Sequence, residues 1–521
     1  MRYLVAALLT SFLSLCMPAQ AAQPGSPQLF PAFPVEALQP SRQNDQYQQG
    51  LRGLWSLPGG GYFVDVRADG PRFYTYADGG KLCWLDQALT SLDPDESPLA
   101  YYAQSPEKTD TVFTDVPGDV QFHARTIAAL PAACGDAIDR STPLDTFDAA
   151  VASLHDYYSF SAARHVDWAE RGNNLRPVAA AARNDVELAG VFSELLEGLQ
   201  DVHTSIAKDN LKIEMDLSTS TVRTHRLLRE AFAQQSEIVD FSTWFEVWNQ
   251  TQNDAIYALL SPQGRGRVYG DAFMWGTLAG NVGYLAINRV DKLDSGGGVD
   301  DRTAVAQTLD RALGEMQGTR ALVLDISMNT GGSTDIIAAA AARFADRRRL
   351  VYTREMPKDP TAAPQPFYIE PAGTVRYAQP VYVLTSDVTV SAAEYLILYM
   401  RVLPQATQIG QTTQGALAGS FVRGLPNGWH MGIANHITRD ARGNSYEVVG
   451  IHPDVIFDVF PESGFDAGHV NAIRKGVELA GGSALTVAAP AIGNIAPAIM
   501  VLLLIAVARV GRSALSARSE S

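Results

Sequence analysis

Residues 321–332 read ALVLDISMNTGG, and residues 381–394 read VYVLTSDVTVSAAE. In both stretches a short, continuous apolar run is followed at once by a polar turn. Such runs are typical of strands buried on both faces of a sheet, and a third run, VGYLAI, spans residues 282–287. Helical patterns occupy residues 305–316, 336–344 and 392–403. Because strand and helix alternate, we expect an α/β fold with a largely parallel sheet.

Residues 145–262 predict helices instead. Apolar residues recur at positions 188, 191, 192, 195, 196 and 199, which is the spacing of one helix face. Asn184 would cap this helix, and Asp145 or Thr146 would cap an earlier one. The predicted helix ends just before His203.

The part of the chain before residue 140 favours strands. Residues 62–66 and 72–76 alternate between apolar and polar side chains, as half-buried strands do. The DGG stretch at residues 78–80 predicts the turn of a hairpin. We expect a small β module here, without a catalytic group.

The composition and the absence of certain motifs disfavour nucleic-acid binding, metal binding and nucleotide binding. The chain has 521 residues, more than one ordinary core needs, so we expect two or three domains. Its formal net charge of -15 disfavours a nucleic-acid partner, because phosphate binding needs a basic face. The sequence has no HExxH motif, no Cys/His cluster and no phosphate-binding loop, so we expect no metal and no nucleotide cofactor.

The N-terminus has the pattern of an export signal. Arg2 is followed by an apolar run over residues 4–15 and by a small-x-small cleavage site at residues 19–21. A membrane anchor is the alternative, although the run is shorter than the roughly 20 residues that span a bilayer. Without the signal, Cys83 and Cys134 are the remaining cysteines. They could pair in an oxidising compartment or stay as two buried thiols.

The C-terminal end predicts a membrane anchor. Residues 488–508 carry no charge and would form a helix of about 31 Å, and arginines follow at positions 509, 512 and 518. The arginines would keep the C-terminus inside. Proline and glycine in the first half of the segment leave a buried or peripheral helix as the alternative.

Ser391 is the candidate nucleophile. It follows a buried apolar run and opens a helix, where free N–H groups and the helix dipole favour negative charge. The Gly331-Gly332 turn has a similar place and could bring backbone N–H groups close to a ligand. The plain alternatives are a serine N-cap and a common strand-to-helix turn.

A serine hydroxyl needs a general base, and His203 is the candidate. It lies just past the strongest helical pattern, although a single histidine is more often structural. His430, His436 and His452 have nothing in their surroundings that sets them apart from surface histidines.

Six short motifs occur in one order: LQDVHT, GYLAI, LDISMNTGG, TVSAAE, IGQTTQG and VVGIHPD, between residues 199 and 454. This set resembles the tail-specific and C-terminal-processing serine peptidases, most closely their tricorn-core branch. The resemblance covers residues 50–478, with no PDZ-like segment between His203 and Tyr284. It implies a crotonase/ClpP-like α/β catalytic domain, behind a helical cap and a small N-terminal β module.

The resemblance also implies roles for single residues. Ser391 matches the nucleophile, and the N–H groups of Gly331, Gly332 and Ala392 match the oxyanion hole. Ala416 stands where one branch of the family has a lysine, which excludes a serine–lysine dyad.

The base would then be His203, in the position of the histidine-using branch. Glu447 matches the acid that orients this histidine, either directly or through Thr204; its alternative is an exposed charge on a strand. Asp201, Asn329 and Glu394 are expected to support loops.

We therefore expect an exported, membrane-anchored serine peptidase that acts on peptides or proteins, without a cofactor. A non-catalytic peptide- or lipid-binding protein of the same fold, and a structural envelope protein, are the alternatives. The expected organisation is a signal peptide (1–21), a β-rich module (22–144), a helical cap with His203 (145–277), the catalytic domain (278–480), a linker (481–494) and the apolar segment (488–508).

Overall fold

The computed structural model describes residues 29–107, 109–135, 141–208, 210–215, 220–234, 240–293 and 299–482. Within these ranges no helix is long and apolar enough to cross a membrane. The predicted signal peptide at residues 1–21 and the apolar segment at 488–508 lie outside the described residues.

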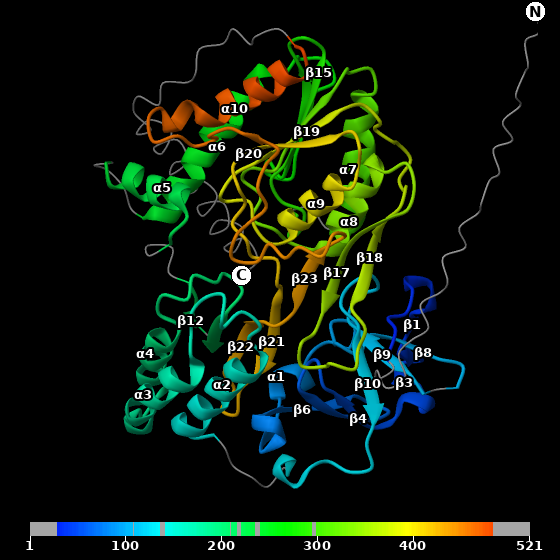
Figure 1. Cartoon of the computed structure of the whole chain (residues 1–521), viewed down its shortest axis with the longest axis vertical. Helices are drawn as coiled ribbons and strands as arrows, with labels where there is room; N and C mark the ends of the chain where they lie inside the picture. The colour runs from blue at the N-terminus through cyan, green and yellow to red at the C-terminus, as the bar shows by residue number, and fades with distance from the viewer. Residues whose placement is uncertain are drawn as a thin grey trace, which may run out of the picture.

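A seven-stranded sheet forms the centre of the upper half of the molecule in Figure 1. Its strand order is β13-β14-β15-β16-β19-β20-β24. The strands from β15 to β24 run parallel, and β13 and β14 are antiparallel. The bounds are β13 Gly266–Val268, β14 Phe273–Leu278, β15 Val282–Ile287, β16 Leu322–Asp325, β19 Val381–Thr385, β20 Ala406–Gly410 and β24 Val455–Ile456. The predicted α/β fold is confirmed, and the three apolar runs are β15, β16 and β19.

Helices cover both faces of this sheet, which explains why its strands are apolar throughout. Leu322 and Leu324 of β16 pack toward one face, and Val323 packs toward the other. The first face is covered by α7 (Asp301–Glu315), α8 (Thr334–Ala341) and α9 (Ala392–Arg401). The second is covered by α6 (Phe241–Leu259) and α10 (Phe465–Leu479), and α5 (Arg223–Ala233) packs beside α6 (Figure 1).

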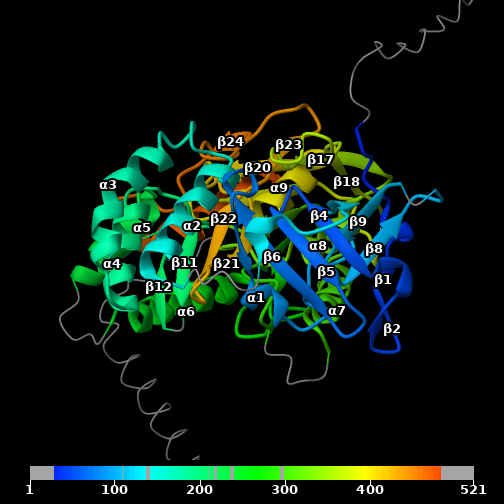
Figure 2. The same cartoon turned by 90° about the horizontal axis from the view of Figure 1, so that it is seen from below.

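The N-terminal module is an eight-stranded sheet with the order β1-β8-β9-β10-β4-β5-β6-β7. It lies beside helices α2 to α4, as the view from below in Figure 2 shows. The bounds are β1 Gln39–Pro40, β4 Gly53–Leu57, β5 Tyr62–Val66, β6 Pro71–Ala77, β7 Leu82–Leu85, β8 Tyr101–Gln104, β9 Thr111–Thr114 and β10 Phe122–Thr126, with α1 (Gln87–Thr90) and the small pair β2 (Arg42–Gln43) and β3 (Gln46–Tyr47) at its edges. β6 and β7 form the predicted hairpin around residues 78–80.

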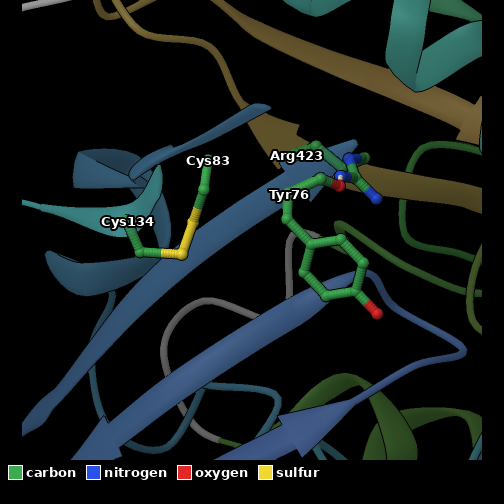
Figure 3. The surroundings of a disulfide bond; sticks show 4 residues. All are labelled: Tyr76, Cys83, Cys134 and Arg423. Carbon is green, nitrogen blue, oxygen red and sulfur yellow. Dashed lines mark hydrogen bonds between the residues drawn. A yellow bond between two sulfur atoms is a disulfide. The ribbon is translucent and has the colours of Figure 1, made fainter. Parts of the chain in front are cut away.

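Cys83 of β7 is bonded to Cys134 by a disulfide, which settles the alternative of two free thiols (Figure 3). Arg423 reaches the same module from the second half of the chain. Its guanidinium donates to the backbone oxygens of Gly60 at 2.8 Å and Tyr76 at 2.7 Å. These bonds fix the β module against the catalytic region.

Helices α2 (Pro143–Tyr157), α3 (Trp168–Ala181) and α4 (Asp185–Leu196) form the predicted helical region. The predicted N-cap at Asp145 or Thr146 is wrong. Thr142 caps α2 by accepting the N–H of Asp145, and Pro143 takes the first helical position, where a missing N–H costs nothing. Asn184 caps α4 as predicted.

Two strands interrupt the predicted helical cap. β11 (Ser205–Lys208) and β12 (Leu211–Ile213) join β22 (His430–Ala434) and β21 (Ser420–Gly424) in a four-stranded sheet. A further sheet consists of β17 (Arg349–Glu355), β18 (Gln365–Ile369) and β23 (Ile437–Asp440). Backbone pairing thus joins the segment after His203 to the second half of the chain, across the predicted boundary at residues 277 and 278, and the domain limits stay a prediction.

Candidate active site

Ser391 lies between β19 and α9 with a φ of 61° and a ψ of -129°. A positive φ is uncommon for a residue with a side chain, and such strain is often found at functional sites. The loop before it is anchored to the neighbouring turn: Thr389 Oγ1 donates to the Ile326 oxygen at 3.0 Å, and Ser386 Oγ donates to the Ser327 oxygen. Ser391 is therefore held in place by the turn that follows β16.

His203 Nε2 lies 3.0 Å from Ser391 Oγ. The histidine stands on the turn between α4 and β11, and its backbone N–H donates to Asp201 Oδ1 at 2.9 Å. β11 pairs with β22, which carries the turn toward Ser391. Two side chains that are 188 positions apart in sequence thus come within hydrogen-bonding distance.

The surroundings of His203 keep its imidazole neutral. Burial lowers the pKa of His203 below its usual 6.5, the nearby charge of Asp201 raises it, and that of Arg164 lowers it. A neutral ring can accept the hydroxyl proton of Ser391. Its Nδ1 atom is buried and has no hydrogen-bond partner among the described residues.

Glu447 is not placed as predicted. Its Oε2 accepts the N–H groups of Leu417 at 2.7 Å and Ala418 at 2.9 Å, and its Oε1 lies 3.5 Å from Arg164 Nη2. With its oxygens engaged in this way, it forms no hydrogen bond with His203. Nor does Thr204 connect the two, because its hydroxyl donates to Asp201 at 3.2 Å.

The alternative of an exposed strand charge is also wrong for Glu447. The residue is only 8% exposed and lies in a turn after β23. Burial, together with the charge of Asp201, raises the pKa of Glu447 to about 8.

Arg164 lies between Asp201 and Glu447, and the sequence patterns did not predict it as part of the site. Its guanidinium lies 3.7 Å from Asp201 Oδ2 and 3.5 Å from Glu447 Oε1, and it also donates to the Gln200 oxygen. Tyr158 OH donates to the same Asp201 oxygen at 2.8 Å. Arg164 stands in an irregular segment between α2 and α3, where no spacing pattern could have pointed to it.

Two of the three predicted oxyanion donors have N–H groups that could bind an anion. Neither Gly332 nor Ala392 has a hydrogen-bond partner for its N–H group within the described part of the chain. The N–H of Gly331 is already used, since it donates to Asn329 Oδ1 at 2.8 Å. The prediction of Gly331 as an oxyanion donor is therefore wrong.

Gly331 instead provides clearance. Its φ is 109°, and a Cβ atom there would lie 2.7 Å from the Cβ of Ser391. Asn329, which holds the Gly331 N–H, is itself fixed by a bond to the Ile287 oxygen at 2.8 Å. The turn after β16 thus places its backbone directly against Ser391.

Glu394 supports the loops around Ser391, as expected for it. The buried carboxylate accepts the N–H of Ser391 at 3.2 Å, the hydroxyl of Thr413 at 2.6 Å, and the N–H groups of Gly415 at 2.9 Å and Ala416 at 2.8 Å. Burial raises the pKa of Glu394 to about 7, although these hydrogen bonds act to lower it.

A cleft of about 380 Å³ opens in front of Ser391 and His203. The β module contributes Asp115 and Phe122 to its lining, and β17 contributes Arg354. His436, which had no distinguishing sequence pattern, also lines the cleft and is only 6% exposed. Burial, followed by the charge of Arg354, holds the pKa of His436 well below its usual range, so its ring is neutral.

A comparison with known protein families finds a match in the second half of the chain. Residues 281–457 match the model of peptidase family S41. This range includes Ser391, the Gly331-Gly332 turn and Glu447, whereas His203 lies outside it.

Several solved structures are similar. A putative peptidase from Parabacteroides merdae ATCC 43184 has 21% identity and a TM-score of 0.47, covering 65% of this chain and 97% of its own. The photosystem II D1 C-terminal processing protease has 15% identity and a TM-score of 0.36, covering 62% and 95%. The tricorn protease has 12% identity and a TM-score of 0.35, covering 80% and 45%.

These three TM-scores are all below 0.5, so the likeness of whole structures carries no argument here. The family match instead coincides with the strands, turns and helix that surround Ser391. It supports the predicted resemblance to the tail-specific proteases: residues 281–457 match peptidase family S41.

Proposed function

We propose that this chain is an exported serine peptidase with Ser391 as nucleophile and His203 as general base. The observation that carries the proposal is the 3.0 Å distance between His203 Nε2 and Ser391 Oγ. A hydroxyl is a weak nucleophile unless an adjacent base accepts its proton. The lowered pKa of His203 supports this role, because the ring is unprotonated at neutral pH.

The reaction begins when Ser391 Oγ attacks the substrate carbonyl carbon and its proton passes to His203 Nε2. The carbonyl oxygen becomes an oxyanion, which accepts hydrogen bonds from the N–H groups of Gly332 and Ala392. His203 then gives its proton to the leaving amine, and the peptide bond breaks. A water molecule, deprotonated by His203, hydrolyses the acyl-enzyme in the same manner.

The charge on protonated His203 needs a stabilising partner. Asp201 raises the pKa of His203 through its charge and also binds its backbone N–H. We assign Asp201 the electrostatic part of this role. Glu447 acts as a positioning residue, since it fixes the backbone of residues 417 and 418 and faces Arg164.

The substrate is a peptide or protein, as membership of a peptidase family implies. The cleft beside Ser391 is built from the β module, β17 and the segment around residue 420, so all of these regions would contact the substrate. The segment carrying His203 would complete the site as part of a cap.

Export is supported by the disulfide between Cys83 and Cys134, because disulfides persist in oxidising compartments. The signal pattern at residues 1–21 agrees with it. Anchoring through residues 488–508 is proposed from the sequence of that segment alone.

Replacing the nucleophile tests the proposal. Ser391→Ala should abolish both peptidase activity and covalent labelling by a fluorophosphonate. His203→Ala should keep the fold and lower kcat by at least about a thousandfold, as loss of the base does in serine proteases. His430→Ala, at an exposed histidine, is the control and should retain full activity. Undiminished turnover in Ser391→Ala would refute the assignment.

A further inference from the structure

The cleft in front of Ser391 is bordered by the loop at residues 115–121, which joins β9 to β10 of the β module. The catalytic region holds this loop in place. Arg354 Nη1 of β17 donates to Asp119 Oδ1 at 2.6 Å, and Gln365 Nε2 of β18 donates to the backbone oxygen of Asp119 at 2.7 Å. Figure 1 shows β17 and β18 reaching down to β9 and β10. The loop therefore has a fixed position beside the cleft, where its side chains can contact a substrate.

Among the described residues, three charged side chains line this cleft: Asp115, Asp119 and Arg354. Asp119 and Arg354 form an ion pair with each other at 2.6 Å. Arg354 is also held by Tyr395, whose hydroxyl accepts its Nε–H at 3.1 Å. The two histidine rings of the cleft are neutral, since burial lowers the pKa of both. Asp115 is thus left as a negative charge without a cationic partner in the described part of the chain.

Asp115 has one carboxylate oxygen available to a ligand. Its Oδ1 accepts the N–H of Val116 at 2.8 Å and the hydroxyl of Thr114 at 3.4 Å, both from its neighbours in the chain. Its Oδ2 has no hydrogen-bond partner among the described residues, and the residue is half-buried. Burial, followed by the charge of Asp119, raises the pKa of Asp115 to about 6, so the carboxyl is mostly ionised at neutral pH. A cation beside it would balance this charge.

Apolar side chains line the same cleft. Phe122 of β10 and Phe421 of β21 lie with ring centroids 5.7 Å apart, and Met356, which follows β17, is also part of the lining. Apolar surface of this kind suits the methylene stem of a lysine or arginine, whose charged end extends to a polar group. A cation also interacts favourably with the face of an aromatic ring. The cleft thus combines a surface for an apolar stem with a carboxylate for a positive charge.

We propose that the cleft binds a lysine or arginine side chain of the peptide substrate, and that Asp115 pairs with its positive charge. The stem of this side chain would lie against Phe122 and Phe421. The free N-terminus of a peptide carries the same charge, but it has no stem to cover these rings, so the side chain is the better fit. The inference names the substrate class of the cleft and therefore rests on the proposed function. Asp115 determines specificity in this scheme and takes no part in breaking the bond.

Binding is measured by calorimetry on the full-length Ser391→Ala protein, so that turnover plays no part. The probes are pentapeptides with both ends blocked and alanine at the outer positions, and their central residue is lysine, acetyl-lysine or norleucine. A peptide of alanine alone with a free N-terminus tests the alternative cation. The lysine peptide should bind at least about tenfold more tightly than its two neutral counterparts. Equal affinities, or the tightest binding by the peptide with the free N-terminus, would overturn the proposal.

Asp115→Asn, added to the same protein, should weaken binding of the lysine peptide by about tenfold and leave binding of the neutral peptides unchanged. The amide keeps an acceptor for the Val116 N–H, so the loop should stay in place. Asp69→Asn, at an exposed carboxyl of the same β module, is the matched control and should change neither affinity. Asp115→Arg reverses the charge and should favour the same peptide with glutamate at its centre. An unchanged preference for lysine in Asp115→Asn, or an equal loss in Asp69→Asn, would overturn the proposal.

Turnover tests the same preference in the active protein. A mixture of peptides, made by cutting unfolded proteins at glutamate, is incubated with the wild type, and the cleavage sites are read by mass spectrometry. Lysine and arginine should be enriched at one position relative to the cleaved bond, and Asp115→Asn should lose this enrichment. Cleavage without enrichment would overturn the inference and leave the peptidase standing. Absence of both cleavage and fluorophosphonate labelling at Ser391 would instead refute the proposed function, while calorimetry would still report on Asp115.

Discussion

Ser391 stands at the end of a strand, turn and helix of the central sheet, whereas His203 stands on a turn held by a separate four-stranded sheet. Short-range contacts between the loop before Ser391 and the turn after β16 fix this proposed nucleophile. The position of His203, the proposed base, depends on long-range pairing between β11 and β22 and on the cluster of Asp201, Arg164 and Glu447.

This difference indicates how substitutions in each half of the site should affect catalysis. Around Ser391, backbone geometry should determine activity, since the proposed oxyanion donors and Ser391 are parts of two neighbouring turns. Around His203, charge should determine how readily the ring accepts a proton, because Asp201, Arg164 and Glu447 lie buried around one turn. Substitutions on the first side should therefore change kcat at every pH, and those on the second should change its dependence on pH.

Among the residues around Ser391 and His203, the largest effect is expected from Gly331→Ala. The added Cβ would lie 2.7 Å from the Cβ of Ser391, so the nucleophile or the turn must move. A reacting group that is misplaced by about 1 Å can lower kcat by about a hundredfold. Single-turnover kinetics with a fluorogenic peptide would measure it.

Gly443→Ala is the control for backbone strain alone. Gly443 has a φ of 89°, lies in an exposed bend after β23, and has no atom within 4 Å of its would-be Cβ. Both variants should lose about 1 kcal/mol of unfolding free energy, but only Gly331→Ala should lose activity. Activity within threefold of wild type in Gly331→Ala would show that this clearance is unnecessary.

An intermediate effect, limited to alkaline pH, is expected from Glu447→Gln. Because burial raises the pKa of Glu447 to about 8, the carboxyl is mostly protonated at pH 7 and ionised at pH 9. Glutamine resembles the protonated form. The variant should match the wild type below pH 7 and lose about tenfold in kcat/KM above pH 9, where the ionised carboxylate would pair with Arg164 and hold the backbone N–H groups of residues 417 and 418 more strongly than an amide does.

The measurement is the ratio of kcat/KM between wild type and Glu447→Gln from pH 6 to pH 10. Glu355→Gln, at a partly exposed carboxyl that pairs with Arg439, is the control and should give a flat ratio. A large ratio already at pH 6 would mean that Glu447 is ionised throughout and that the argument from its burial fails.

The sequence predicted the nucleophile side better than the histidine side, for a physical reason. The apolar runs that became β15, β16 and β19 and the turns after them are local patterns, so the α/β fold and the positions of Ser391 and Gly332 followed from them. The used N–H of Gly331 could not be foreseen, because it depends on the direction of the Asn329 side chain.

The histidine side depends on contacts between distant segments. Arg164 is separated from Glu447 by 283 positions, and no spacing rule connects them. β11 and β12 are short strands next to strong helices, so the helical pattern concealed them. The family resemblance supplied His203 and Glu447 as residues, but the structure decided that Glu447 faces Arg164 and the backbone of residues 417 and 418.

The smallest and most specific effect is expected from Asp201→Asn. The charge of Asp201 raises the pKa of His203 and that of Arg164 lowers it, so removing either should move the acid limb of kcat/KM in opposite directions. Asp201→Asn should shift this limb to lower pH by several tenths of a unit and, since a weaker base accepts the proton less readily, reduce kcat a few-fold at pH 7. Arg164→Gln should shift the limb to higher pH. Shifts of the same sign in both variants would mean that altered packing of the turn, and not charge, determines the strength of the base.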